Sequence, residues 1–372
     1  MITGLNHLLA ETAQPGLPEL REVLTELMGG NSDVDRFIEH QTLQPRGQRV
    51  FRLRFGANGC TRSLIIKRLN PEIALRNELV ATRWLPAIGL QNGCAPLLDK
   101  AAARNGECVW HIYEDLGQWE LNPKNPQPEQ LHAAVELIAG LHAAFAGHPL
   151  LGEIRLHGSD FGIHFYESNV RDALAAVQAL DPPSDYRALH KQLLDRLHRL
   201  LTQLPQRAES MLQLSGPETM LHGDLWAINV FAIRQGPKWN ARLIDWDHAG
   251  VGPISYDLST FLLRFPESER SWILRAYRDA LHAAGGELPS DRDLNRIFET
   301  HELARFANRL IWPAIAVAID KADWGWAELA EVEQWFEQFQ PIIPLARPFS
   351  SLANQLDSKS GASSKTDNVT AL

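Results

Sequence analysis

Two polar segments near the middle of the chain, each attached to an apolar run, constrain the fold most strongly. Residues 220–229 (MLHGDLWAIN) contain Asp224 and Asn229 within the spacing H-x-D-x-x-x-x-N. Phosphoryl transfer needs a carboxylate that accepts a hydroxyl proton and a nearby amide oxygen that holds Mg²⁺. In residues 243–252 (LIDWDHAGVG), Asp245 ends an apolar strand and adds a hard oxygen ligand suited to the same ion. Together the two segments predict a phosphoryl-transfer site at the ends of strands.

The first third of the chain has the pattern of a small antiparallel sheet with one main helix. Alternating polar and apolar residues predict strands at residues 34–43, 49–55, 63–67, 95–98 and 109–113. The spacing of apolar residues predicts a short helix at 17–28 and the main helix at 71–85. We expect residues 1–116 to form an N-terminal, nucleotide-binding lobe.

Beyond residue 116 the pattern is mostly helical. Helices are predicted at residues 129–145, 170–180, 186–204, 267–283, 291–320 and 324–338. Residues 147–168 are expected to be irregular, and residues 350–372, rich in Ser, Lys, Asp and Gly, predict a disordered tail. We expect residues 117–345 to form a larger C-terminal lobe with the catalytic and acceptor-binding groups. The predicted fold class is α+β, with two lobes and a substrate cleft at their junction.

Composition excludes several classes of function. The net charge is -9 over 372 residues and no basic block is present, which argues against a nucleic-acid partner. Cys60, Cys94 and Cys108 lack C-x-x-C spacing, so neither a zinc site nor a disulfide framework is expected. The first residues lack a charged leader, and no segment approaches the roughly 20 apolar residues of a membrane span. We expect a cytoplasmic protein with no membrane partner, and the sequence leaves its oligomeric state open.

The two central segments carry a resemblance to a known family. Residues 221–229 and 243–252, followed by Tyr256-Asp-Leu, are similar to those of the aminoglycoside phosphotransferase and choline kinase family. Gly223, where protein kinases usually have Arg, and Trp246, in place of Phe, are typical of its small-molecule kinases. The similarity extends over residues 34–341. It implies a protein-kinase-like fold with a small antiparallel-sheet N-lobe and a larger, mostly helical C-lobe.

The resemblance implies a role for each main site residue. Asp224 would be the catalytic base that orients the acceptor hydroxyl and takes its proton. Asn229 and Asp245 would hold Mg²⁺. Lys67, at the end of a predicted strand, would contact the α- and β-phosphates and be held by an ion pair with Glu78. Glu72 lies on the same predicted helix and is the alternative partner.

The nucleotide would lie against two backbone segments. Residues 113–117 (YEDLG) resemble the family's hinge, where the carbonyl of Glu114 and the amide of Leu116 would bind adenine. Residues 44–49 (QPRGQR) would cover the phosphates. This turn has one glycine, Gly47, rather than the G-x-G-x-x-G of protein kinases, so the amides that contact phosphate are left open.

Three further residues are expected to support the site. By resemblance, the His222 ring stabilises the catalytic loop rather than transferring a proton. Asp257, at the start of a helix, would bind the backbone of that loop through hydrogen bonds. Asp247 is open between a contact to metal, water or a cationic substrate and a loop anchor.

These residues predict a phosphotransferase that uses ATP, with GTP as the alternative, and Mg²⁺ to phosphorylate a hydroxyl of a small polar molecule. The acceptor is expected over the helical lobe, near residues 158–168 and the helix around Glu299, Glu302 and Arg305. A cationic acceptor would be expected to meet Asp247, Glu299 or Glu302. The alternatives are an aminoglycoside resistance kinase, a housekeeping kinase for a sugar, amino acid or choline-like alcohol, and a catalytically inactive nucleotide-binding protein. A protein kinase is disfavoured because residues 252–257 follow Asp245 without an activation segment.

Overall fold

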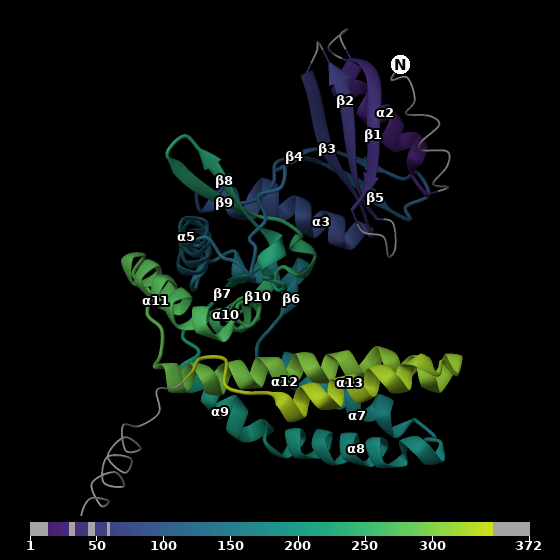
Figure 1. Ribbon diagram of the computed structural model, residues 1–372, viewed down its shortest axis with the longest axis vertical. Coiled ribbons are helices and arrows are strands. Elements are labelled where there is room, and N and C mark those ends of the chain that lie inside the picture. The colour runs from purple at the N-terminus through teal and green to yellow at the C-terminus, as the bar shows by residue number, and fades with distance from the viewer. Residues whose placement is uncertain (1–13, 30–33, 44–48, 58–59, 345–372) are drawn as a thin grey trace, which may run out of the picture.

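A five-stranded antiparallel sheet forms the upper lobe of the computed structural model, which describes residues 14–29, 34–43, 49–57 and 60–344 (Figure 1). In spatial order its strands are β1 (Val34–Thr42), β2 (Val50–Ala57), β3 (Cys60–Leu69), β5 (Val109–Glu114) and β4 (Leu97–Ala102). The helix α2 (Leu17–Gly29) covers one face. Its Leu20 and Leu24 are completely buried with Leu53, Phe55 and Ile112 of the sheet.

The helix α3 (Pro71–Leu79) runs between the sheet and the lower lobe (Figure 1). It continues through a π-helical turn, Val80–Trp84, into α4 (Leu85–Ala87). Val80 and Trp84 are completely buried, and they belong to the large core of the lower lobe rather than to the core of the sheet. α3 is therefore packed as part of both lobes.

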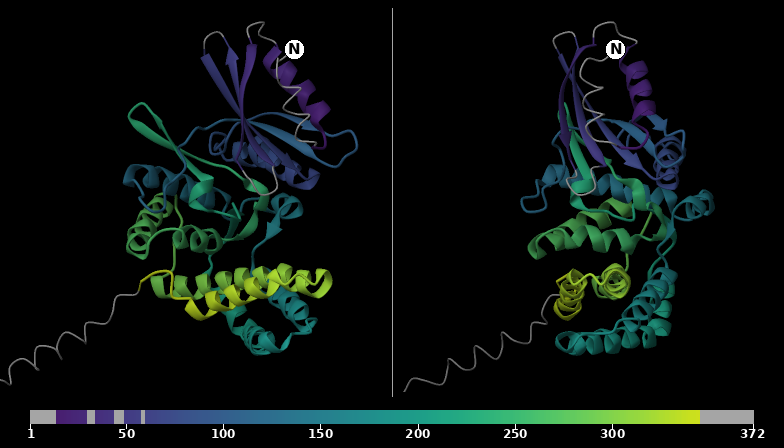
Figure 2. Two further views of the ribbon diagram at one scale, coloured as in Figure 1. Left: turned by 45° about the vertical axis from the view of Figure 1, so that its right-hand side comes forward. Right: turned by 90° about the vertical axis from the view of Figure 1, so that its right-hand side faces the viewer.

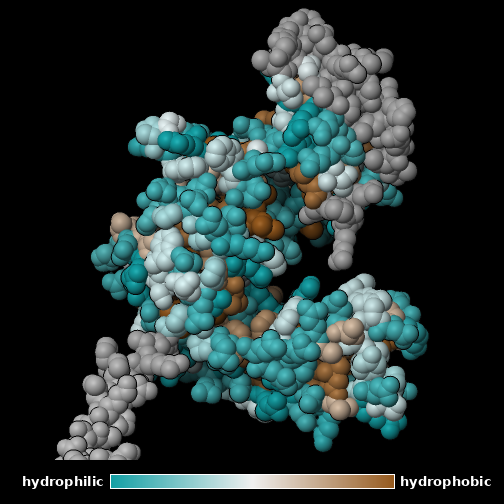
Figure 3. Space-filling view, viewed as in Figure 1, coloured by the Kyte–Doolittle hydropathy of each residue, from teal (hydrophilic) through white to brown (hydrophobic). Residues whose placement is uncertain are grey.

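Helices build most of the lower lobe. They are α5 (Pro128–Phe145), α6 (Leu151–His157), α7 (Ile163–Gln178), α8 (Arg187–Thr202), α9 (Leu204–Leu214), α10 (Ile254–Leu263), α11 (Glu267–Ala283), α12 (Asp291–Ile315) and α13 (Trp324–Gln338). α5 packs on α11, while α12 packs on α7 and runs beside α13 in both views of Figure 2. Figure 3 shows a notch between this α12–α13 layer and the part of the molecule above it.

Short strands hold the two sequence motifs in place. β6 (Ser159–Asp160), β10 (Gly250–Pro253) and β7 (Glu218–Leu221) form a small three-stranded sheet, and β8 (Val230–Gln235) pairs with β9 (Lys238–Leu243) in a hairpin. The first motif, residues 220–229, begins at the end of β7 and leads into β8. The second motif, residues 243–252, begins at the end of β9 and leads into β10. The two loops are thereby fixed side by side below the first sheet.

The predicted α+β, two-lobed fold is confirmed, with local corrections. The stretch 147–168 is not irregular: it contains α6 and the start of α7, anchored by the buried Leu151, Ile154 and Tyr166. Its glycines and histidines obscured this apolar spacing. The helix predicted at 186–204 is interrupted before α9, which has a proline in its first turn. Gly47 and the tail predicted at 350–372 lie outside the described residues. No helix in the described part of the chain combines the length and apolarity needed to cross a membrane.

Candidate active site

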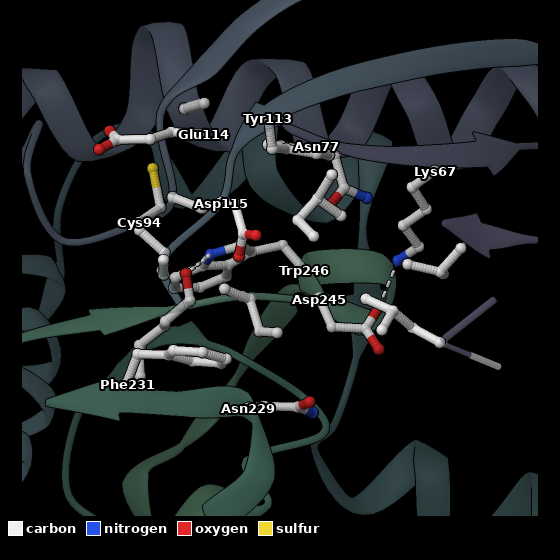
Figure 4. Close-up of a pocket in the computed structure, with 18 of the residues that line it drawn as sticks. Lys67, Asn77, Cys94, Tyr113, Glu114, Asp115, Asn229, Phe231, Asp245 and Trp246 are labelled. Carbon is white, nitrogen blue, oxygen red and sulfur yellow. Dashed lines mark hydrogen bonds and ion pairs between the residues drawn. The ribbon is translucent and has the colours of Figure 1, made fainter. Parts of the chain in front are cut away.

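A pocket of about 280 Å³ lies between the two lobes. Its walls are mostly apolar. They come from the first sheet and the segment before β4, the π-helical turn after α3, the connector between the lobes, and the β8–β9 hairpin with the loops beside it: Leu43, Val50, Ile65, Ala81, Cys94, Ala95, Tyr113, Leu116, Ile228, Phe231, Leu243 and Ile244. Lys67, Asn229 and Asp245 also line it, and Figure 4 shows them together at one end of the group of side chains drawn. An apolar slot that ends in charged groups fits a flat ring attached to a charged chain.

The connection between the lobes passes along this pocket. Glu114 and Leu116, which the sequence assigns to adenine binding, both line the pocket. The backbone N–H of Glu114 donates to Pro96 O at 3.0 Å, which joins the end of β5 to the segment before β4. Its side chain lies 3.4 Å from Arg242. The two residues are therefore placed where a ring in the slot can meet their backbone.

Asp115, between these two residues, was missed by sequence reasoning. Arg52 of β2 donates to both of its oxygens, at 2.7 and 3.1 Å, and the side chains are 10% and 8% exposed. Ser63 Oγ and the Gly117 N–H donate to the same carboxylate. Burial raises the pKa of Asp115, but the hydrogen bonds from Arg52 and Ser63 outweigh burial and lower it. An acidic residue in a connector gives no pattern by which this contact with β2 and β3 could be found.

Lys67 points from β3 into the pocket and meets two carboxylates of the second motif. Its Nζ lies 2.5 Å from Asp245 Oδ1 (Figure 4). The same nitrogen lies 2.7 Å from Asp247 Oδ1. Burial raises the pKa of Asp245, but Lys67 outweighs burial and holds this pKa below its usual value. Asp247 is also bound by Asn77 Nδ2 at 3.0 Å. Asp247 therefore joins the second motif to both β3 and α3.

The expected ion pair between Lys67 and Glu78 is absent. Both oxygens of Glu78 instead lie 2.7 Å from Nζ of Lys100 on β4. A helix turns by about 100° per residue, so the position that faces the second motif is Asn77, one residue earlier, while Glu78 faces the sheet edge. A rotation of α3 by one residue decides whether Asn77 or Glu78 faces the second motif, and the sequence pattern does not define the helix to that precision. The other candidate, Glu72, is exposed on the first turn of α3.

The hydrogen bonds expected of Asp257 are present. Its oxygens accept from the backbone N–H of His222 at 2.7 Å and of Gly223 at 3.0 Å, and His142 Nε2 lies 3.3 Å away. Asp257 is almost completely buried at the start of α10. Burial raises its pKa, but the contacts with His142 and with the His222 backbone prevail, and the pKa is lowered. A buried carboxylate thus fixes the loop that precedes Asp224.

The His222 ring connects the two motifs. Its Nε2 lies 2.8 Å from the Ile244 carbonyl, which can only accept, and Nδ1 faces the Asp224 N–H at 3.3 Å. Nε2 must therefore carry the proton and Nδ1 must accept. Both nitrogens are engaged by backbone groups, as expected of a supporting residue.

Asp224 and Asn229 lie on the same loop. Asn229 Nδ2 donates to the Asp224 backbone carbonyl at 2.9 Å, so the amide oxygen is the atom of this side chain that could bind a cation. Asp224 itself is half-buried. Burial raises its pKa, and the neighbouring Asp245 adds to this effect. A carboxylate with a raised pKa is a stronger base than an exposed aspartate.

Gly223 is required by the close approach of the two motif loops. Its φ is +81°, a conformation that side-chain-bearing residues rarely adopt, and a Cβ there would overlap the His248 carbonyl. Asp245, in the facing loop, also has a left-handed backbone conformation, with φ 65°. The loops are therefore packed backbone against backbone.

The donor set fits Mg²⁺. The amide oxygen of Asn229 and the carboxylate of Asp245 are hard oxygen donors, and no cluster of three His, Cys, Asp or Glu side chains suited to a metal occurs in the described ranges. Mg²⁺ is commonly held by one or two carboxylates together with substrate phosphates and water. Two oxygen donors are too few to enclose an ion on their own. They suit Mg²⁺ that is also bound by phosphate and water.

The carboxylates expected to meet a cationic acceptor are engaged elsewhere. Glu302 forms an ion pair with Arg305, and Glu299 lies 2.8 Å from Arg207. Another charged residue, Arg264, lies close to the loop that carries Asp224: its guanidinium carbon lies 3.4 Å from the ring centre of Trp226. The end of a helix gives no sequence signal for such a contact, and Arg264 was not predicted.

Comparison with known proteins agrees with this architecture. A model of the phosphotransferase enzyme family matches residues 44–294, more than half of the chain. No curated protein matches the sequence at a significant level.

Solved structures of similar fold include small-molecule kinases. An ethanolamine kinase of Plasmodium vivax has 14% identity and a TM-score of 0.55, covering 89% of this chain and 95% of its own. The spectinomycin phosphotransferase APH(9)-Ia, in complex with ADP and spectinomycin, has 15% identity and a TM-score of 0.51, covering 87% and 95%. The amicoumacin kinase hAmiN, in complex with AMP-PNP, Ca²⁺ and Ami, has 13% and 0.52, covering 88% and 95%. At these identities the similarity establishes the protein-kinase-like fold.

Proposed function

Since this chain belongs to the phosphotransferase enzyme family, we propose that it is an ATP-dependent kinase that transfers the γ-phosphoryl group to a hydroxyl of a small polar molecule. The observation that carries the proposal is the meeting of Lys67, Asn229 and Asp245 at the interlobe pocket, with Asp224 on the same loop as Asn229. Nucleotides bound in similar folds, ADP and AMP-PNP, support the choice of co-substrate.

Asp224 would act on the acceptor. Its half-buried carboxylate would accept a hydrogen bond from the acceptor hydroxyl and orient it towards the γ-phosphorus. It would take the hydroxyl proton as the new O–P bond forms and the bond from the γ-phosphorus to the β-phosphate oxygen breaks, which releases ADP. The raised pKa of Asp224, caused mainly by burial, increases its basicity. Asp257 and His222 would keep this loop in place through the backbone contacts described above.

Lys67, Asn229 and Asp245 would act on the nucleotide. Lys67 would contact the α- and β-phosphates, while Asn229 and Asp245 would hold the magnesium ion. The chemistry that bound Mg²⁺ supplies is neutralisation of charge on the phosphate oxygens. The backbone at Glu114 and Leu116 would bind the adenine ring within the apolar part of the slot. The acceptor would approach through the notch above the α12–α13 layer (Figure 3).

The proposal is tested by ADP release in the presence of MgATP or MgGTP and a panel of amino alcohols, sugars, hydroxy acids and aminoglycosides. Acceptor-dependent ADP release and a phosphorylated product detected by mass spectrometry are the expected results. The matched control is Asp224→Asn, which keeps the nucleotide pocket and should remove transfer. Nucleotide binding without turnover of any acceptor would favour the inactive nucleotide-binding alternative.

A further inference from the structure

Arg264 is held on the loop that carries Asp224. It caps the C-terminal end of α10, where its backbone N–H donates to Phe261 O at 3.1 Å. Its guanidinium carbon lies over the Trp226 ring, 3.4 Å from the ring centre. The backbone N–H of Trp226 in turn donates to the backbone carbonyl of Asp224 at 2.8 Å. The cation is thus fixed through one aromatic ring to the backbone of the proposed base.

Arg264 is not neutralised within the described part of the chain. Its neighbours in charge are Asp224, Glu302 and Arg305, and Glu302 is already paired with Arg305. No described residue forms an ion pair with the guanidinium of Arg264, whereas Arg207 has Glu299 as its partner. Stacking uses only the face of the guanidinium, so its edge N–H groups stay available for a planar anion.

The remaining charges near Asp224 do not suit a cationic acceptor. Glu302 is 4% exposed and bound by Arg305, and Asp247 is bound by Lys67 and Asn77. Asp224 is the carboxylate needed for the acceptor hydroxyl. A cationic group on the acceptor would therefore meet a positive Arg264 and no spare carboxylate among these residues.

We propose, on the basis of the kinase function proposed above, that Arg264 binds an anionic group on the acceptor. The acceptor is then a hydroxy acid, whose carboxylate takes two parallel hydrogen bonds from the guanidinium while its hydroxyl lies against Asp224. A phosphate ester with a free hydroxyl offers the same chemistry to Arg264. An amino alcohol does not.

The test compares acceptors that share a carbon skeleton and differ in charge: glycerate, glycerol 3-phosphate and 3-amino-1,2-propanediol, followed by longer matched sets. ADP release is measured with MgATP. We expect kcat/KM for the carboxylate to exceed that for the amine by at least about tenfold, since an arginine–carboxylate contact replaces a repulsive one. A higher kcat/KM for the phosphate ester would support the anionic class with phosphate as its source.

Variants of Arg264 separate binding from a merely structural role. Arg264→Gln should raise KM for the anionic acceptor by about tenfold or more. It should raise KM for a neutral acceptor by a clearly smaller factor and leave the KM for MgATP unchanged. Arg264→Lys keeps the charge but not the planar, two-pronged guanidinium. Its KM for the anionic acceptor should therefore lie between that of the wild type and that of Arg264→Gln. Arg309→Gln is the matched control. Arg309, on α12, also lies over a tryptophan, with its guanidinium carbon 6.0 Å from the ring centre of Trp335 on α13.

Three outcomes would overturn the inference. They are an equal or higher kcat/KM for the amines, an Arg264→Gln effect that is the same for anionic and neutral acceptors, and no turnover of any matched set by an enzyme that binds MgATP and phosphorylates another acceptor class. Failure of the proposed function looks different: no acceptor of any charge is phosphorylated, in wild type or variant.

Discussion

Nζ of Lys67 lies 2.5 Å from Oδ1 of Asp245, so the side chain proposed to hold phosphate neutralises the side chain proposed to hold the metal. Asp247 receives the same ammonium group at 2.7 Å. A phosphate and a cation entering together would give Lys67 and Asp245 new partners of opposite charge at the same time, whereas either ligand alone would leave one of the two without a partner. The two ligands should therefore bind cooperatively.

Lys67→Met should change the affinities for metal and for nucleotide in opposite directions. Without the ammonium group, Asp245 and Asp247 are unpaired carboxylates, so Mg²⁺ alone should bind more tightly than to the wild type. MgATP should bind at least about tenfold more weakly because a charge-assisted phosphate contact is lost. Titration calorimetry measures both. Lys100→Met, which removes the exposed partner of Glu78, is the control and should leave both affinities unchanged.

Asp224→Asn should lower kcat by about 10²–10⁴ while leaving the affinity for MgATP intact, because the residue acts on the acceptor. In the wild type only the ionised carboxylate accepts a proton. Burial raises the pKa of Asp224, so the acidic limb of kcat/KM should lie above 3.8, the ordinary value, and activity is lost as the pH falls through it. Asp245, whose pKa is lowered, cannot produce this limb. A limb that persists unchanged in the residual activity of Asp224→Asn would contradict the assignment.

Asp257→Asn should destabilise the fold by about 3 kcal/mol, since an amide replaces a buried carboxylate that accepts two backbone N–H bonds. The pKa of Asp257 is lowered in the folded state, so its stabilisation is complete above the unfolded carboxyl pKa and is lost as the pH falls through the folded one. Urea unfolding as a function of pH measures both effects. Asp279→Asn, on the exposed side of α11, should change neither.

The contact between Arg52 and Asp115 should stabilise the folded protein through a measurable coupling between the two side chains. A double-mutant cycle with Arg52→Met and Asp115→Asn should give a coupling free energy of unfolding well above the roughly 0.2–1 kcal/mol of exposed pairs. Both side chains are nearly buried and the contact is bidentate. The single variants should also raise KM for MgATP because the connector lines the pocket. The exposed pair Arg54–Glu39 on β2 and β1 supplies the control cycle. Equal coupling in the two cycles would contradict this prediction.

The central motifs were predictable because their information is local. The spacing from His222 to Asn229 lies within one loop, and the apolar run before Asp245 marks a strand end, so neither depends on the rest of the fold. The fold class followed from the order of alternating and helical patterns, and it is confirmed. The catalytic and metal-binding roles of these residues stay predictions.

The contacts that the sequence did not reveal depend on register and on distant partners. Glu78 and Asn77 differ by one helix position, yet one faces Lys100 and the other Asp247. Asp115 and its partner Arg52 are 63 positions apart in the chain. Arg264 acquires its place only because α10 ends beside the loop that carries Trp226. No pattern within a short window contains such information.

The burial of Trp84 indicates the order in which the two cores can form during synthesis. The core beneath the first sheet uses side chains from Leu20 to Ile112 and can close once β5 has been made. The indole of Trp84, by contrast, is completely buried, donates to Glu153 at 3.0 Å and shares a core with residues as distant as Ile343. A growing chain can therefore complete the sheet before Trp84 is buried. All residues that line the pocket between the lobes have been made once Trp246 is added, before α11, α12 and α13.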